Sequence, residues 1–342
     1  MSPTTRPVPA DIQAALARSP VDLAGRDLRG LELADLDLTG ASLVGADLRG
    51  AVLLRLRLRR ADLARADLSD LRGEDLDLGD ADLSHARLDR AVFTRLDLHD
   101  ALVDGASWLA VRMPGADLRG LTLARVALAD ADLAGADLSG ADLDAADLTR
   151  TSLLGARLRR CSLVAAVLTG HDLRGCDLAD ADLSRAHAAG LRLDRADLSR
   201  ARLGAADLRG ASLRDVRARF ADLGDADLSG ADLRGADLRG AWLAGARLAR
   251  ANLALARLER ANLALADLRD AVATGLRGAC ADLSRARLER ADFTGADLQH
   301  VRMHRSFETG ANFSGADLRH VTRTDAALAA AEDFSPAPKA SP

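Results

Sequence analysis

The chain has 342 residues, 48% of them hydrophobic, which is enough to build a sizeable buried core. Its 47 basic and 51 acidic residues give a formal net charge of only -4, which excludes the strong basicity expected of a nucleic-acid-binding protein. Aromatic residues make up 2% and tyrosine is absent, so leucine and alanine supply most of the apolar mass. This narrow composition indicates one small motif used many times.

Residues 1–20 precede the repeats and contain one predicted helix, over residues 10–18. Ile12, Ala15 and Leu16 would share one face of this helix, and Ser19-Pro20 would end it. The segment lacks the continuous apolar stretch of an export signal, and no run of 18 apolar residues occurs anywhere in the chain. We therefore expect a cytoplasmic protein that does not enter the membrane.

From Val21 to His320 the chain repeats every five residues, in the pattern Ala-Asp-Leu-x-x. Of the sixty pentapeptides, 47 have Leu at the third position, and 40 have Ala at the first. A period of five matches neither the 3.6 residues of a helical turn nor the alternation of a flat strand. A turn must therefore recur in every pentapeptide.

This motif resembles the A(D/N)LXX motif of the pentapeptide-repeat family, over residues 21–320. The resemblance implies an all-β fold: a right-handed quadrilateral β-helix of about fifteen coils, with four pentapeptides in each coil. The first and third positions would point inward and the other three would face solvent. Stacked coils about 4.8 Å apart would make a rod roughly 70 Å long.

The two open ends of such a rod expose unpaired backbone groups and need caps. The helix predicted over 10–18 would cap one end. In residues 321–342 a second short helix, over 325–334, would cap the other and precede a disordered tail. A terminal cap also offers a surface for a homodimer.

Acidic residues gather on one side of the predicted rod within residues 61–140. If every twentieth residue shares a side, this side carries Arg119 and six aspartates, which we name the acidic patch: Asp77, Asp80, Asp97, Asp100, Asp117 and Asp137. We expect a protein-docking surface about 20 Å long. The alternative is a solvated ladder of ion pairs. The nearby run from Glu74 to Asp82 lacks the glycine spacing of a calcium loop.

Some departures from the motif at inward positions can be interpreted as packing. Leu71 and Gly73 exchange the large and small inward residues, and Phe93 would lie directly over Gly73 in the next coil. Trp108 and Met113 are larger than the positions they occupy and flank Pro114, so we predict a local bulge over 106–115.

Two clusters contain residue types that bind metals. Cys161, His171 and Cys176 occupy first positions of one coil, but a structural zinc site normally needs four ligands, so we interpret them as structural. With Cys280 the thiols are odd in number, and no disulfide is expected. His300, His304 and His320 form either a surface metal or pH-sensitive cluster, or a solvated patch, which we favour.

No GxxxxGK[ST], GxSxG or HExxH motif occurs, so neither an enzyme nor a cofactor is predicted. The first hypothesis is a rigid rod that binds a protein partner. The second comes from the resemblance: quinolone-resistance members of the family imply a mimic of duplex DNA that binds gyrase or another topoisomerase. The near-balanced charge favours the first hypothesis, because duplex DNA carries about one charge per 1.7 Å.

Overall fold

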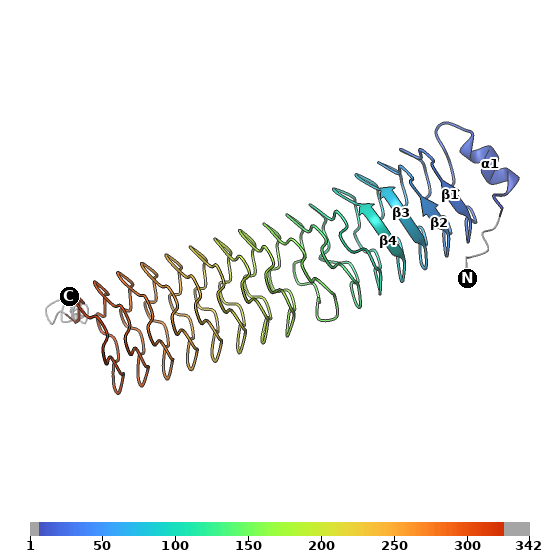
Figure 1. The fold of residues 1–342 in the computed structure, drawn as a ribbon. Helices are drawn as coiled ribbons and strands as arrows, with labels where there is room; N and C mark the ends of the chain where they lie inside the picture. Colours follow the sequence, from blue (N-terminus) through green and yellow to red (C-terminus); the bar gives the residue numbers. More distant parts are fainter. Residues whose placement is uncertain (1–6, 325–342) are drawn as a thin grey trace, which may run out of the picture.

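The computed structural model describes residues 7–324, which form one elongated rod (Figure 1). Its regular strands lie near the N-terminal end and form a parallel sheet in sequence order. They are β1 (Glu32–Ala34), β2 (Val52–Leu54), β3 (Arg72–Asp77) and β4 (Val92–Asp97). Each strand pairs with residues twenty positions further on. Within residues 7–324 the fold is therefore all-β apart from one helix, with parallel pairing between successive coils.

Beyond the strands, isolated parallel bridges continue the same register along the rod. They run from the pair Asp22 and Ser42 to the pair Arg302 and Thr322, always between residues twenty apart. Outside the four strands, each pentapeptide contributes one bridging residue and one turn. A coil therefore consists of four pentapeptides, each forming one side, as the resemblance implied.

The pentapeptide motif has a local structural reason. The second-position Asp accepts a hydrogen bond from the backbone N–H two residues later, as Asp232 Oδ1 does from Arg234 at 3.2 Å. The fifth residue then takes a left-handed conformation, with φ of +67° at Gly235. The N–H of the next first-position residue closes the turn, as between Ala231 and the carbonyl of Leu228 at 2.9 Å. This turn recurs every five residues and makes the corner.

The inward residues form one continuous core along the rod. First-position and third-position residues such as Ala231 and Leu233 are fully buried, and they belong to a single hydrophobic cluster. Phe93 fills the space left by Gly73: a Cβ placed on Gly73 would lie 2.6 Å from Phe93 Cδ1. The predicted exchange of large and small residues is confirmed.

The predicted bulge over 106–115 is wrong. Trp108 and Met113 are fully buried, and their neighbours keep the regular register, with Ser107 paired to Ala127 and Arg112 to Asp132. The core takes in the indole without an inserted residue, although its Nε1 has no hydrogen-bond partner among the described residues. The register is therefore maintained on the sides of this coil that carry Ser107 and Arg112, with no residue inserted.

Helix α1 (Ala10–Leu16) lies at the N-terminal end of the rod (Figure 1). Ile12 and Ala15 are buried in the same cluster as the repeat core, so the helix packs on the first coil. It ends two residues earlier than predicted, and the Ser19-Pro20 peptide bond that follows is cis. The helix predicted over 325–334 and the tail lie outside the described residues.

Candidate interaction surfaces

The structure brings the six residues of the acidic patch onto one side of the rod. Parallel bridges join Asp77 to Asp97, Asp97 to Asp117 and Asp117 to Asp137, so these aspartates form a column with one member per coil. Asp80 and Asp100 lie at the corner of the same side, in the left-handed conformation, with φ of +58° and +55°. The predicted grouping follows directly from the twenty-residue coil.

Basic groups neutralise much of this patch. Arg59 Nη2 lies 2.8 Å from Asp80 Oδ2, and its Nη1 lies 3.9 Å from Asp77. The other partners are Arg119 at 2.6 Å from Asp117, Arg157 at 3.6 Å from Asp137, and the His99 ring at 2.6 Å from Asp97. Within residues 7–324, Asp100 is the one member with no such ion pair. The patch therefore has a smaller effective charge than its six carboxylates suggest.

Two titratable groups in the patch have shifted pKa values. The hydrogen bond from Arg119 holds the pKa of Asp117 below its ordinary value, although partial burial opposes this. The hydrogen bond to Asp97 raises the pKa of His99, again against partial burial. The contact between His99 and Asp97 thus favours a positive charge in the middle of the acidic column.

Asp97, His99 and Asp117 are close enough to suggest a metal site that the sequence analysis did not name. One ligand atom from each lies within 4.8 Å of the others. Three contacts already occupy these groups: Asp97 bonds to His99, Arg119 donates to both oxygens of Asp117, and Arg59 Nη2 lies 3.4 Å from His99 Nε2. The two arginines would repel a cation, so we assign no metal to this cluster.

Cys161, His171 and Cys176 do not converge on one point. Both thiols are buried, and burial raises the pKa of Cys161 to about 12 and also raises that of Cys176. His171 Nε2 lies 2.6 Å from the backbone carbonyl oxygen of Thr151. The imidazole therefore has the backbone partner that the structural interpretation expected.

The histidines near the C-terminal end form a pair rather than a cluster of three. The rings of His300 and His320 stack, with centroids 4.6 Å apart and planes 11° from parallel. Among the residues that the structure describes, no group of three metal-ligating side chains includes His304. The coil spacing itself brings the two rings into contact.

A second surface, which the sequence analysis missed, surrounds two exposed aromatic residues. The exposed fractions of Phe220 and Trp242 are 68% and 52%. The ring of Phe220 covers Gly240, where a Cβ would lie 2.6 Å from Phe220 Cε1. A hollow of about 580 Å³ lies beside this ring and is lined by Arg219, Phe220, Arg239, Gly240, Glu259 and Arg260. We name these residues, with Trp242, the aromatic-arginine surface.

The hollow has more positive than negative groups. Asp237 binds two of its arginines, with Arg239 at 2.6 Å and Arg219 at 2.8 Å. No carboxylate of residues 7–324 forms an ion pair with Arg260. The five-residue frame could have revealed this surface, because Phe220 and Trp242 fall at outward positions where polar residues predominate.

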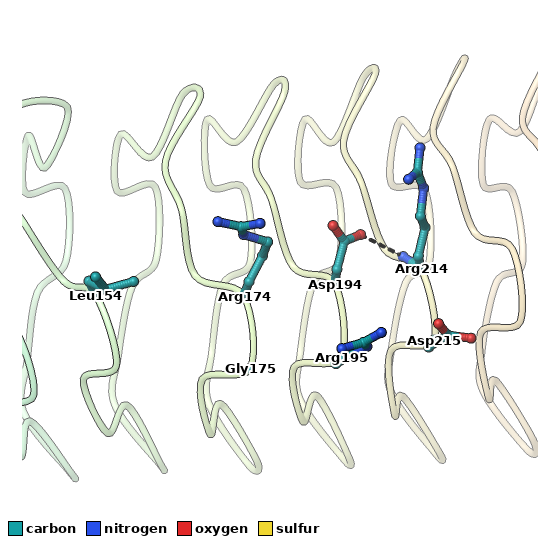
Figure 2. Close-up of a pocket in the computed structure, with 7 residues that line it drawn as sticks. All are labelled: Leu154, Arg174, Gly175, Asp194, Arg195, Arg214 and Asp215. Atoms are coloured by element: carbon teal, nitrogen blue, oxygen red, sulfur yellow. Dashed lines mark hydrogen bonds between the residues drawn. The ribbon is translucent and has the colours of Figure 1, made fainter.

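Another hollow, of about 490 Å³, runs along four successive coils (Figure 2). Its lining alternates in charge, with Arg174, Arg195 and Arg214 beside Asp194 and Asp215. The backbone N–H of Arg214 donates to Asp194 Oδ1 at 3.0 Å, the bond drawn in Figure 2. This lining is a ladder of opposite charges, with three arginines against two aspartates, and we assign no ligand to it.

The described chain has no helix long and apolar enough to cross a membrane. None of the curated proteins matches the sequence. Among solved structures, full-length QnrB1, a plasmid-mediated fluoroquinolone resistance protein, is 20% identical, with 70% of this chain and 96% of that chain covered and a TM-score of 0.39. HetL, a pentapeptide repeat protein involved in heterocyst differentiation regulation from the cyanobacterium Nostoc sp. strain PCC 7120, is 26% identical, with 91% of each chain covered and a TM-score of 0.15.

The family described as pentapeptide repeats matches this chain over most of its length. The matched segments together cover residues 21–70, 74–107, 112–270 and 280–307. The structure shows the same period, because each pentapeptide outside the four strands contributes one bridge and one turn. The chain therefore belongs to the pentapeptide-repeat family.

Proposed function

We propose that this protein is a non-enzymatic rod of about fifteen coils, between flanking segments 1–20 and 321–342, that binds other proteins through its outward side chains. Helix α1 would cap one end. The aromatic-arginine surface carries this proposal. Trp, Phe and Arg are enriched at the centres of protein interfaces. Here the side chains of Phe220 and Trp242 are exposed to solvent on a backbone that is hydrogen-bonded to the neighbouring coils.

The charge of this surface indicates the kind of partner. Of the three arginines that line the hollow, Arg219 and Arg239 are already paired with Asp237, so the positive charge for a partner comes chiefly from Arg260. An acidic segment with an apolar side chain for the space beside Phe220 fits best. The acidic patch would serve a different, basic partner. The rod thus offers two surfaces of opposite charge at different heights along its axis.

A comparison of captured proteins tests this proposal. We expect the variant Phe220→Ser, Trp242→Ser, Arg260→Glu to lose a protein that the wild type captures from extracts of its own cells. The matched control is Leu102→Ser with Leu265→Ser, which removes two other exposed apolar side chains. If both variants capture the same proteins as the wild type, the aromatic-arginine surface is not an interface.

The acidic column supports a second candidate, a DNA mimic that binds gyrase or another topoisomerase. Its carboxylates recur once per coil, about every 4.8 Å. Duplex DNA carries about one charge per 1.7 Å, so the same length presents roughly twice the charge of the patch. Arg59, Arg119 and Arg157 reduce the charge of the patch further. The contrast in charge density favours the general interaction rod.

Gyrase supercoiling assays, with and without a quinolone, separate the two candidates. If the protein is a DNA mimic, the wild type should change gyrase supercoiling. The variant with Asp77, Asp80, Asp97 and Asp100 replaced by Lys should lose this effect. The control replaces four exposed aspartates elsewhere, Asp104, Asp215, Asp222 and Asp225, and should retain the effect. Equal behaviour of wild type and patch variant would rule out DNA mimicry and leave the interaction rod standing.

A further inference from the structure

The ladder between coils is interrupted at three steps. Along the described chain, bridges join residues twenty apart on all four sides, except between Leu102 and Thr122, Ala127 and Asp147, and Ser152 and Asp172. Each interruption lies 25 residues beyond the previous one, which is one coil further along the rod and one side further around it. The three steps therefore form a single spiral seam.

Backbone hydrogen bonds are absent at the same steps. Third-position N–H groups elsewhere donate to the next coil, as Leu233 does to Asn252 at 2.7 Å. Among the bonds of residues 7–324, the N–H groups of Val103, Leu128 and Leu153 make no such bond. Each step thus lacks a backbone hydrogen bond of the kind that joins the coils at Leu233.

At two of the three steps a cavity lies between the neighbouring coils. A cavity of about 200 Å³ separates residues 126–129 from residues 147–150 at the second step. A cavity of about 250 Å³ separates residues 149–154 from residues 170–172 at the third. Figure 2 shows a wider gap from the coil of Leu154 to that of Arg174 than from Arg174 to Asp194.

Buried polar side chains partly replace the missing backbone bonds. His171 contacts the carbonyl of Thr151, and the Thr151 hydroxyl donates to the carbonyl of Leu128 at 2.9 Å. These two contacts connect three successive coils across the seam. Side-chain bonds of this kind constrain the distance between coils less than paired backbone bonds do.

The fourth side stays closed. Its bridges run without interruption from Asp37 to Asp317, and this is the side that carries the acidic patch. Three sides thus contain one step each without a bridge, two of them with a cavity between the coils, while the acidic side contains none. Lengthening three sides of a square rod against a fixed fourth side bends the axis toward that fourth side.

We propose that the seam is a hinge whose spine is the acidic side, and that its opening makes the acidic patch concave toward a convex basic protein surface. The hinge divides the rod into two stiff parts, residues 21–101 and 173–320. This inference rests on the proposed interaction rod for its partner, whereas the hinge itself depends only on the seam.

Hydrogen exchange of the full-length protein tests the seam. We expect the amides of Val103, Leu128 and Leu153 to exchange on the order of 100-fold faster than the equivalent amides of Leu208, Leu233 and Leu258, because only the latter donate across a coil step. Equal protection of the two sets would overturn the hinge.

Distances between spin labels test the bending itself. With Cys280→Ser to remove the exposed native thiol, a pair at Arg65→Cys and Arg185→Cys spans the seam on an open corner. Arg185→Cys with Arg305→Cys spans six intact coils on the same corner, about 29 Å at the usual spacing. We expect a longer and broader distance distribution for the first pair, and identical distributions would refute the hinge.

A third pair, Arg60→Cys with Asp180→Cys, lies on the acidic side and should match the intact control. A longer distance in this pair as well would show that the coils separate evenly, without bending, and would also overturn the proposal. If the exchange and distance results support the hinge but the wild-type protein captures no partner, the result counts against the proposed function alone.

Discussion

At the scale of single residues, the second position of the pentapeptide decides both the turn and the surface charge. Asp232 illustrates this: one oxygen accepts the N–H of Arg234, while its carboxylate also binds the guanidinium groups of Arg234 and Arg214 at 2.7 and 2.6 Å. A side chain that shapes the backbone therefore also carries an ion pair, so it affects stability and charge together.

This arrangement predicts a pH dependence at Asp232. The hydrogen bond from Arg234 is the main reason that the pKa of Asp232 falls from 3.8 to about 2. Because the folded-state pKa lies below the unfolded one, the ionised carboxylate stabilises the fold above about pH 4, and this contribution disappears as the pH falls through 2. We expect Asp232→Asn to lower the melting temperature at pH 7 and much less at pH 2.

The control for this experiment is Asp222→Asn, which removes a turn aspartate that has no ion pair within residues 7–324. Like Asp232, Asp222 accepts a hydrogen bond from the backbone N–H two residues later, here that of Gly224. A melting difference at Asp232 that stays constant from pH 7 to pH 2 would show that the carboxylate charge contributes nothing.

The contact between Gly73 and Phe93 predicts a coupled pair of substitutions. A methyl group on Gly73 would clash with the Phe93 ring at 2.6 Å, so Gly73→Ala should destabilise the protein by about 1–3 kcal/mol. Phe93→Leu opens the space, and the double variant should lose less stability than the sum of the single variants, measured by chemical denaturation. Simple additivity would mean that the two residues do not compete for one space.

The buried thiols predict an absence of metal dependence. Because Cys161 and Cys176 stay protonated and His171 bonds to the backbone, the double variant Cys161→Ala, Cys176→Ala should keep the wild-type circular dichroism and zinc content. Elemental analysis that finds stoichiometric zinc in the wild type and none in the variant would contradict this assignment.

At the scale of the structural element, the pentapeptide buries its two inward residues only with help from the coils on either side. Leu233 is fully buried, and its own coil leaves the layer above and below it open. The unit of stability is therefore the contact between coils, and damage to one layer affects its neighbours.

A substitution at a central inward position tests this view. Leu233→Ala should reduce the free energy of unfolding by ~2–5 kcal/mol, because it leaves a cavity in a dry core. Ser229→Ala, an outward position on the preceding side, should leave it nearly unchanged. Denaturation curves of Leu233→Ala that coincide with the wild type would contradict the inward assignment.

At the scale of the whole molecule, the stack of coils couples neighbours strongly and distant coils weakly. The seam between residues 102 and 172 lowers the coupling further, since ladder bonds are missing there on three sides. The two parts of the rod should therefore unfold with partial independence. This expectation concerns cooperativity and is separate from bending.

Calorimetry measures this cooperativity. We expect the calorimetric enthalpy of unfolding to exceed the van't Hoff enthalpy, because more than one unit unfolds. One symmetric transition with equal enthalpies would show that the seam transmits unfolding as well as the intact ladder does.

The amino-acid sequence by itself predicted the parts of this protein that repeat. The five-residue frame separates recurring apolar positions such as Leu233 from polar ones such as Asp232. With the four pentapeptides per coil that the resemblance implied, the same frame locates Phe93 over Gly73. The side shared by the acidic patch followed once the resemblance supplied four pentapeptides per coil. The exposed Phe220 and Trp242 were equally available from the frame.

The tertiary structure decided the features that depend on contacts between coils. Arg59 reaches Asp80 from 21 residues away, and this pairing reduces the charge of the patch. Trp108 fits without an inserted residue, while the ladder is interrupted at three steps between residues 102 and 172, the first of them in the coil that holds Trp108. Such outcomes depend on the summed packing of several layers, which no single pentapeptide encodes, whereas the turn and the inward Leu are settled within five residues.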